Sequence, residues 1–192
     1  MTSRSKYHAV VIGSSAGGLN ALKLLFSDLD AKFRLPVIIV QHISPDSENY
    51  LIHILNDLKK LRVKEADEKE KPERGSAYVA PPNYHLLLEP DQTFSLTIDE
   101  RVNYARPSID VLFETAAEAY QEKLIGIILT GANNDGSKGL KRIREMGGLT
   151  IVQDPDTAEV DSMPRAAILT SVVDHIMTLK EIALFLNSLE VA

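Results

Sequence analysis

Three residues of this chain carry the side chains that a nucleophilic hydrolase needs: Ser15, His42 and Asp135. Each follows a strand-like apolar run, and the runs are residues 9–12, 36–41 and 124–130. The carboxyl ends of the strands in an open parallel α/β sheet lie along one edge, where ligands bind. We therefore expect a hydroxyl, an imidazole and a carboxylate to meet in one crevice, as in a Ser-His-Asp catalytic triad.

Ser15 lies in the sequence G-S-S-A-G, residues 13–17, which matches the G-x-S-x-G pattern of a nucleophile elbow. In such an elbow a tight turn joins a strand to a helix, and the N–H groups at the helix start can stabilise an oxyanion. A glycine-rich turn before a helix can equally bind a phosphate. The dinucleotide fingerprint G-x-G-x-x-G is absent, because Ser15 stands where its second glycine would be, and the P-loop lysine is absent too. The pattern alone leaves both interpretations open.

His42 and Asp135 also have simpler interpretations. His42 could be a solvated turn residue, and Asn-Asp-Gly at 134–136 is an ordinary turn or cap sequence. Asp135, however, follows the most apolar run of the chain, where a carboxylate is costly unless it is paired, and a histidine N–H would be such a partner. Asp154 and Asp156 are the rival carboxylates. The order Ser–His–Asp differs from the Ser–Asp–His order of α/β-hydrolases, which narrows the family without excluding the chemistry.

Composition excludes several other classes of protein. The 192 residues are 44% hydrophobic and 25% charged, as in a globular domain, and no cysteine is present for disulfides, thiolate catalysis or cysteine-ligated zinc. The formal charge of −6 argues against a nucleic-acid partner, which would need a basic surface. His, Asp and Glu lack metal-ligand spacing, so we expect no metal and no cofactor. No apolar run approaches the roughly 20 residues that cross a bilayer, and we expect a cytoplasmic protein without direct membrane insertion.

Strand-like and helix-like segments alternate along the chain. Strands are expected at residues 9–13, 36–41, 75–80, 85–89, 94–98, 124–130, 149–153 and 172–174, with an edge strand within 62–74, and the three between 75 and 98 look short and open to antiparallel pairing. Helices are expected at residues 17–28, 47–60, 109–120, 137–146 and 179–189, with a short one opening at 163–165 and Ser108 as the N-cap of the third. The pattern predicts an α/β fold: a mostly parallel, doubly wound sheet with a small antiparallel insertion, a Rossmann-like three-layer sandwich made by one domain over residues 1–192.

Several separate sequence blocks resemble one family. They are I-G-S-S-A-G-G at 12–18, Q-H at 41–42, A-Y-V-A-P at 77–81, R-P-S-I-D-V-L-F at 106–113, I-L-T-G at 128–131, N-D-G at 134–136 and M-P-R at 163–165. In this order they are similar to the catalytic domain of CheB, the bacterial chemotaxis receptor methylesterase (protein-glutamate methylesterase), over about residues 10–189. The resemblance implies that Ser15, His42 and Asp135 form the triad.

The resemblance also implies the reaction and the partners. The expected function is hydrolysis of methyl esters on glutamate side chains of methyl-accepting chemotaxis receptors, with glutamine deamidation open to the same triad. The implied partners are the cytoplasmic helices of those receptors, together with a separate methyltransferase or receiver protein. A binding module that has kept the fold and lost turnover is the alternative function.

Some features depart from the family pattern, and two arginines of the matching blocks lie outside the triad. Ala16 replaces the usual threonine after the nucleophile, Ala132 replaces a methionine, and Asn133 replaces a glycine. The N-terminal receiver domain of the family is not in this sequence, so we expect activity that does not depend on a phosphodonor. Arg106 and Arg165 lie in blocks outside the triad, and we expect at least one of them to line the substrate groove, with a structural salt bridge as the competing interpretation.

Overall fold

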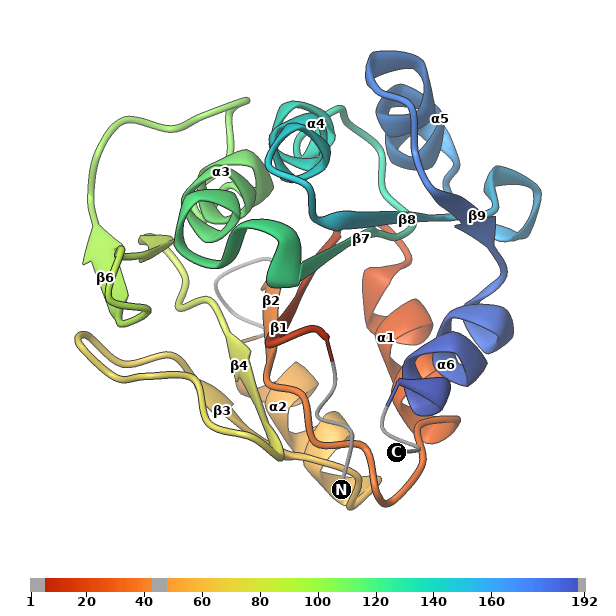
Figure 1. The fold of residues 1–192 in the computed structure, drawn as a ribbon, viewed down its shortest axis with the longest axis horizontal. Coiled ribbons are helices and arrows are strands. Elements are labelled where there is room, and N and C mark those ends of the chain that lie inside the picture. The colour runs from red at the N-terminus through yellow and green to blue at the C-terminus, as the bar shows by residue number, and fades with distance from the viewer. Residues whose placement is uncertain (1–5, 43–47, 190–192) are drawn as a thin grey trace.

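The computed structural model describes residues 6–42 and 48–189. Within these residues the main feature is a seven-stranded, wholly parallel sheet in the order β3-β4-β2-β1-β7-β8-β9 (Figure 1). In chain order its strands are β1 (Ala9–Ser14), β2 (Val37–Gln41), β3 (Arg62–Glu65), β4 (Ser76–Val79), β7 (Leu124–Ile128), β8 (Leu149–Gln153) and β9 (His175–Met177). A second, antiparallel sheet pairs β5 (His85–Leu88) with β6 (Phe94–Thr97).

Helices cover both faces of the parallel sheet (Figure 1). The helices α3 (Ile109–Tyr120), α4 (Ser137–Glu145) and α5 (Ser162–Thr170) pack on one face. The other face is covered by α1 (Gly18–Ser27), α2 (Glu48–Asp57) and α6 (Leu179–Ser188). Each face has its own hydrophobic cluster, so the expected three-layer α/β architecture is confirmed.

The central strands are buried on both faces, which explains their continuous apolar sequences. All residues of β1, β2 and β7 are buried, and β2 reads Val-Ile-Ile-Val before its glutamine. Their parallel register places Ser14 beside Gln41 and Gly13 beside Ile128. The three strands therefore end level with one another, and the loops that follow them share one edge of the sheet.

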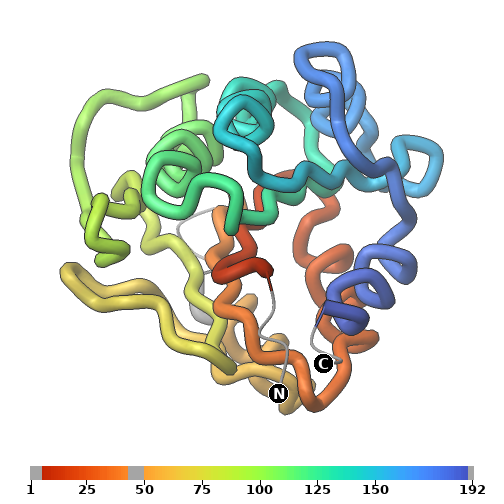
Figure 2. The backbone as a smooth tube through the Cα atoms, in the orientation of Figure 1, coloured from red at the N-terminus to blue at the C-terminus, as the bar shows by residue number. Residues whose placement is uncertain are grey.

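The antiparallel pair lies apart from the main sheet and beside α3 (Figure 2). The Phe94 ring of β6 packs edge-on against Tyr78 of β4, with ring centroids 5.0 Å apart. His85, the first residue of β5, accepts a hydrogen bond at Nδ1 from the Ser108 N–H (3.2 Å) and uses Nε2 toward Glu100 O (2.9 Å). This insertion thus supports the segment that leads into α3.

Two sequence expectations need correction. The strand expected at 75–80 is β4, and it is a parallel member of the main sheet between β3 and β2, where all four residues are buried. The last strand is β9, not residues 172–174, because the Asp174 carboxylate accepts bonds from both the N–H and the hydroxyl of Thr150 (2.9 Å each). Strand pairing with β8 begins only after this side-chain contact. The expected start of the second helix at residue 47 lies outside the described residues, and α2 is described from Glu48.

Candidate active site

A pocket of about 470 Å³ lies at the edge where β1, β2 and β7 end. Ser15 and His42, which follow β1 and β2, line this pocket, and so does Asn133 from the loop after β7. Residues 101 and 103–107, in the segment before α3, line it as well. Asp135 is fully buried and is linked to the pocket by its hydrogen bond to His42.

The turn that presents Ser15 is constrained by its backbone. The Ser15 N–H donates to Thr130 O (3.0 Å), and Ser15 O accepts from the Gly18 N–H (2.8 Å). Gly17 has a φ of 77°, a left-handed conformation that favours glycine, and it is the N-cap of α1. A β-carbon on Gly131 would lie 2.7 Å from the Met163 Cε and 3.0 Å from the Ser15 Cβ, so the facing loop leaves little room for a side chain at this position. The Ser15 side chain is half-buried, and no described residue forms a hydrogen bond with its hydroxyl.

Gln41 connects this turn to His42. Its buried side chain accepts the Ser14 hydroxyl at Oε1 (2.5 Å) and donates from Nε2 to the carbonyl oxygens of Ser15 (2.8 Å) and His42 (2.9 Å). A β-carbon on Gly18 would lie 1.9 Å from Oε1, so this contact requires glycine at the start of α1. One amide group therefore holds the backbone of both pocket residues.

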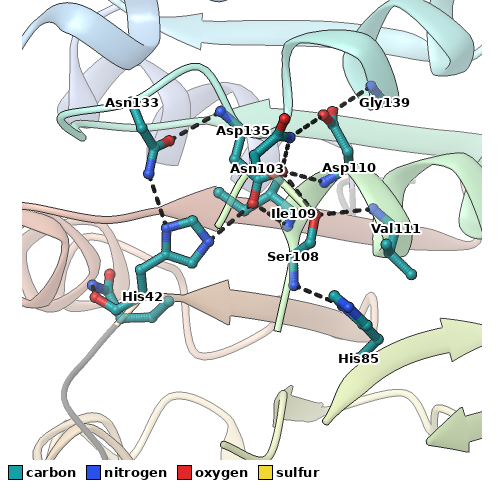
Figure 3. A network of polar contacts seen from close by, with 11 residues as sticks. His42, His85, Asn103, Ser108, Ile109, Asp110, Val111, Asn133, Asp135 and Gly139 are labelled. Carbon is teal, nitrogen blue, oxygen red and sulfur yellow. Dashed lines mark hydrogen bonds and ion pairs between the residues drawn. The ribbon is translucent and has the colours of Figure 1, made fainter. Parts of the chain in front are cut away.

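The side chains of His42 and Asp135, which are 93 positions apart in the sequence, are joined by a hydrogen bond (Figure 3). The imidazole Nε2 lies 3.0 Å from Asp135 Oδ2. The imidazole ring is 15% exposed, whereas the carboxylate is fully buried. This is the arrangement in which a carboxylate orients a histidine and stabilises its cationic form.

The first turn of α3 binds the Asp135 carboxylate. The backbone N–H groups of Ile109 and Asp110 donate to it (2.6 and 3.1 Å), as do the Ser108 hydroxyl (2.8 Å) and the Asn103 amide (2.9 Å). Helix N-termini carry unpaired N–H groups and a partial positive charge, and both favour an anion at that place. Burial alone would raise the pKa of Asp135, but the bonds from His42 and these donors hold it below its ordinary value.

A second buried carboxylate, Asp110, lies next to this network. It accepts the Gly139 N–H of α4 at Oδ1 (2.7 Å) and the Asn103 amide at Oδ2 (2.8 Å). Burial raises the pKa of Asp110, and the nearby charge of Asp135 adds to the shift. The Asn103 amide therefore bridges two acids whose pKa values are displaced in opposite directions.

Asn133 contacts the ring nitrogen of His42 that does not face Asp135 (Figure 3). Its Nδ2 lies 3.3 Å from His42 Nδ1, and its Oδ1 accepts the Asp135 N–H (3.0 Å). Both ring nitrogens of His42 thus have partners in the structure.

Sequence reasoning missed several of these roles. Ser108 caps α3 as expected, with its oxygen accepting the Val111 N–H, but it also donates to Asp135. Asn103 and Asp110 carried no recognisable signal, because their partners lie far away in the sequence. The block R-P-S-I-D at 106–110, which contributed to the family resemblance, was the one available hint for Asp110.

The other candidate residues lie in different places. The rival Asp154 caps a short turn by accepting the Asp156 N–H (3.0 Å), and neither residue lines the pocket. Arg106 does line it, and its guanidinium donates to the carbonyl oxygens of Ile98 and Asp99 (2.8 and 2.9 Å).

Arg165 fits the competing structural interpretation. It lies outside the pocket and forms ion pairs with Asp161 (2.6 Å) and Asp156 (3.3 Å). The side chains of Ala16 and Ala132, two of the departures from the family pattern, are exposed.

Residues 6–42 and 48–189 contain neither a candidate metal site nor a helix that could span a membrane. No three His, Asp or Glu side chains in these ranges are grouped so that they could hold a metal ion. No helix in the same ranges has the length and apolar character needed to cross a membrane.

The fold and the site together define a three-layer α/β protein with a serine turn and a histidine–carboxylate pair at one sheet edge. The family model of the CheB methylesterase matches residues 10–186, and the chain belongs to this family. The crystal structure of the Thermotoga maritima CheB methylesterase catalytic domain superimposes with a TM-score of 0.90 at 34% identity, covering 97% of this chain and 99% of that one. The expected fold and family are therefore confirmed.

Relatives with curated names are of two lengths. A Leptospira interrogans protein with a provisional name as a protein-glutamate methylesterase/protein-glutamine glutaminase is 57% identical over 177 residues, which are 92% of each chain. The Archaeoglobus fulgidus protein-glutamate methylesterase/protein-glutamine glutaminase is 38% identical, and the matched region covers 96% of this chain but only 55% of that protein. The Myxococcus xanthus protein-glutamate methylesterase FrzG is 37% identical, with 53% of its length covered.

Proposed function

We propose that this chain is a serine esterase that hydrolyses methyl esters on glutamate side chains of methyl-accepting chemotaxis receptors. The observation that carries the proposal is the 3.0 Å hydrogen bond between His42 and the buried Asp135, with His42 lining the same pocket as the constrained Ser15 turn. Membership of the CheB methylesterase family supplies the ester class. In this proposal Ser15 is the nucleophile, His42 the general base and Asp135 the residue that orients His42.

The reaction takes two steps in this scheme. The Ser15 Oγ attacks the ester carbonyl while its proton passes to the His42 nitrogen that does not face Asp135, namely Nδ1. The protonated His42 then gives that proton to the departing methoxide, which leaves as methanol, and an acyl-enzyme remains. Water attacks the acyl group with the same proton transfers, so that glutamate and free Ser15 are restored.

The oxyanion of each tetrahedral intermediate needs N–H donors that are already in place. The backbone N–H groups of Ala16 and Gly17, in the turn before α1, have no acceptor among the described residues. Both groups belong to the turn that carries Ser15. A backbone N–H group can donate whatever side chain stands at position 16. Replacement of the family threonine by Ala16 is therefore compatible with turnover.

Deamidation of glutamine follows the same route. The amide carbonyl takes the place of the ester carbonyl, and ammonia leaves in place of methanol. Because ammonia is the poorer leaving group, we expect the ester to be the faster substrate for this site.

The test is methanol release from methylated receptor membranes by the wild type, Ser15→Ala and the control Ser95→Ala. Ser15 is half-buried on a turn, so Ser15→Ala should keep its melting temperature while its methanol release falls to the background rate. Ser95 lies in β6, away from the pocket, and its variant should behave like the wild type.

Methanol release by Ser15→Ala at the wild-type rate would exclude Ser15 as the nucleophile. Inactivity of the folded wild type on receptor, together with retained receptor binding, would favour the alternative of a binding module that has lost turnover.

A further inference from the structure

Asn133 is oriented unambiguously by its backbone neighbour. Its Oδ1 accepts the Asp135 N–H at 3.0 Å, the two-residue contact of an Asx turn. A backbone N–H can only donate, so the atom that faces it must be the amide oxygen. The amide nitrogen is then the atom 3.3 Å from His42 Nδ1, and it donates to that ring nitrogen.

The contacts of His42 determine where its proton lies. The Asp135 carboxylate already accepts four donors besides His42, and it is ionised because its pKa is held low. The hydrogen in the 3.0 Å contact therefore belongs to His42 Nε2. Nδ1 of the neutral ring is then an acceptor with a single lone pair, and Asn133 donates to it.

The proposed reaction needs the same lone pair. Nδ1 is the only ring nitrogen left to receive the Ser15 proton. Its single lone pair cannot form well-aligned hydrogen bonds with both the Ser15 hydroxyl and the Asn133 amide. The Ser15 hydroxyl, which has no hydrogen-bond partner among the described residues, is not engaged while Asn133 holds Nδ1.

We propose that Asn133 is a positioning residue that caps the catalytic nitrogen of His42, and that Ser15 becomes nucleophilic only when the Asn133 amide leaves Nδ1. This inference rests on the proposed function of Ser15 and His42. The capped state keeps the productive tautomer of His42, with the proton on Nε2, and separates it from the attack step. Asn133 thereby sets how large a fraction of the free enzyme is ready to react.

The geometry makes this release feasible. The Asn133–His42 bond is the longer of the two amide contacts, 3.3 Å against 3.0 Å. Asn133 is only partly buried and lines the pocket, so a bound substrate can contact and displace its amide. A glycine at this position, as in the family pattern, would have no such cap.

The decisive variant is Asn133→Ser. A serine hydroxyl can accept the Asp135 N–H in the corresponding ST turn, so the loop is kept, but it is too short to reach His42. Asn133→Asp is the matched opposite: it keeps the turn and presents an acceptor to Nδ1, which favours a proton on that nitrogen. Melting temperatures of both variants check that they are folded.

Two readouts are needed, and neither uses receptor. The first is the second-order rate at which a fluorophosphonate probe labels Ser15. The second is the ¹⁵N resonance of His42 Nδ1 at a pH where the ring is neutral, which reports whether a donor faces that nitrogen. We expect Asn133→Ser to label about two- to tenfold faster, the factor expected when a competing hydrogen bond of ordinary net strength is removed. Its Nδ1 resonance should move toward that of an imidazole nitrogen without a donor.

For Asn133→Asp we expect slower labelling than the wild type and a resonance that shows a proton on Nδ1. An unchanged or slower labelling rate in folded Asn133→Ser, or an unchanged Nδ1 resonance, would overturn the inference while leaving the proposed function intact. Absence of labelling in the wild type would instead contradict the proposed function, and the resonance would still decide whether Asn133 caps Nδ1.

Discussion

Asp135 is a buried carboxylate whose charge is stabilised by hydrogen bonds in place of water. Both oxygens are used: Oδ1 accepts from Ser108, Asn103 and the Asp110 N–H, and Oδ2 accepts from His42 and the Ile109 N–H. All five partners are donors. A protonated carboxyl or an amide in place of the Asp135 carboxylate would direct its own hydrogen at one of these donors. The network therefore favours an ionised carboxylate at position 135.

Asp135→Asn tests this selection. The amide nitrogen of the variant must face donors, and we expect a loss of about 1–3 kcal/mol in the free energy of unfolding at pH 7. Methanol release should fall severely, because the His42 proton loses the anion that orients it. Urea unfolding between pH 3 and 7 measures the first effect.

The sign of the pH dependence follows from the lowered pKa of Asp135. Its charge stabilises the fold above the ordinary value of 3.8 and this contribution is lost as the pH falls through the lower folded value. The difference in the free energy of unfolding between the wild type and Asp135→Asn should therefore be largest at pH 5–7 and should shrink as the pH falls below about 4. Asp57→Asn, an exposed control in α2, should show only a small gap at every pH. A gap for Asp135→Asn that is independent of pH would contradict this account.

At the scale of the elements, the segment before α3 links the rim of the pocket to the buried Asp135 carboxylate. Its backbone is held by the Arg106 guanidinium on Ile98 and Asp99, and its Asn103 amide binds Asp135. The same segment exposes Tyr104 to 95% and places Arg101 on the rim of the pocket. A fixed loop that displays an aromatic and a cationic side chain beside the pocket is well suited to receive a protein substrate.

Arg101→Glu tests that docking role. A protein substrate modified at glutamates presents carboxylates around each ester, so the added negative charge should lower kcat/KM for methylated receptor several-fold. Hydrolysis of a small neutral ester should be unchanged, because Arg101 is exposed and takes no part in the His42 network. Arg62→Glu is the control. It makes the same charge change at the first residue of β3, at the end of that strand away from the pocket, and should affect neither substrate. Equal losses on receptor and small ester would assign Arg101 a structural role instead.

At the scale of the whole molecule, the site depends on how closely α3 and α4 pack. These helices lie side by side on one face of the sheet, and α4 begins directly after the loop of Asp135 (Figure 1). A β-carbon on Gly139 would lie 2.4 Å from the Phe113 Cβ and 3.1 Å from Asp110 O. The glycine therefore sets the spacing between the helix that binds the Asp135 carboxylate and the helix that follows it.

Gly139→Ala should destabilise the protein although alanine is the better helix former. The gain in helix propensity is about 1 kcal/mol, whereas overpacking against the α3 backbone costs about 1–3 kcal/mol, and we expect the cost to exceed the gain. Chemical denaturation measures the difference, with Lys138→Ala, an exposed neighbour on α4, as the control. If Gly139→Ala is as stable as the wild type or more stable, α3 and α4 can move apart enough to accommodate the added methyl group, and the packing argument is wrong.

The sequence by itself determined the layered fold and the candidate residues. Strands that are buried on both faces of a parallel sheet are nearly continuous apolar runs, and glycines lie in the turns after β1 and β7, so the local pattern located β1, β2 and β7 and the polar residues that follow them. It could not determine the direction of β4 or the position of β9, because strand pairing depends on neighbours that are distant in the chain.

Only the tertiary structure decided which groups complete the site. The four donors to Asp135 besides His42 come from the segment 103–110, and the Asn133 amide reaches His42 across 91 positions. Such contacts produce no periodic pattern in the sequence, because each hydrogen bond requires a particular residue at a single position only. The strand ends place Ser15, His42 and Asp135 at one edge, but the packing of α3 against that edge decides that Asp135 is ionised and that His42 faces Asn133 through Nδ1.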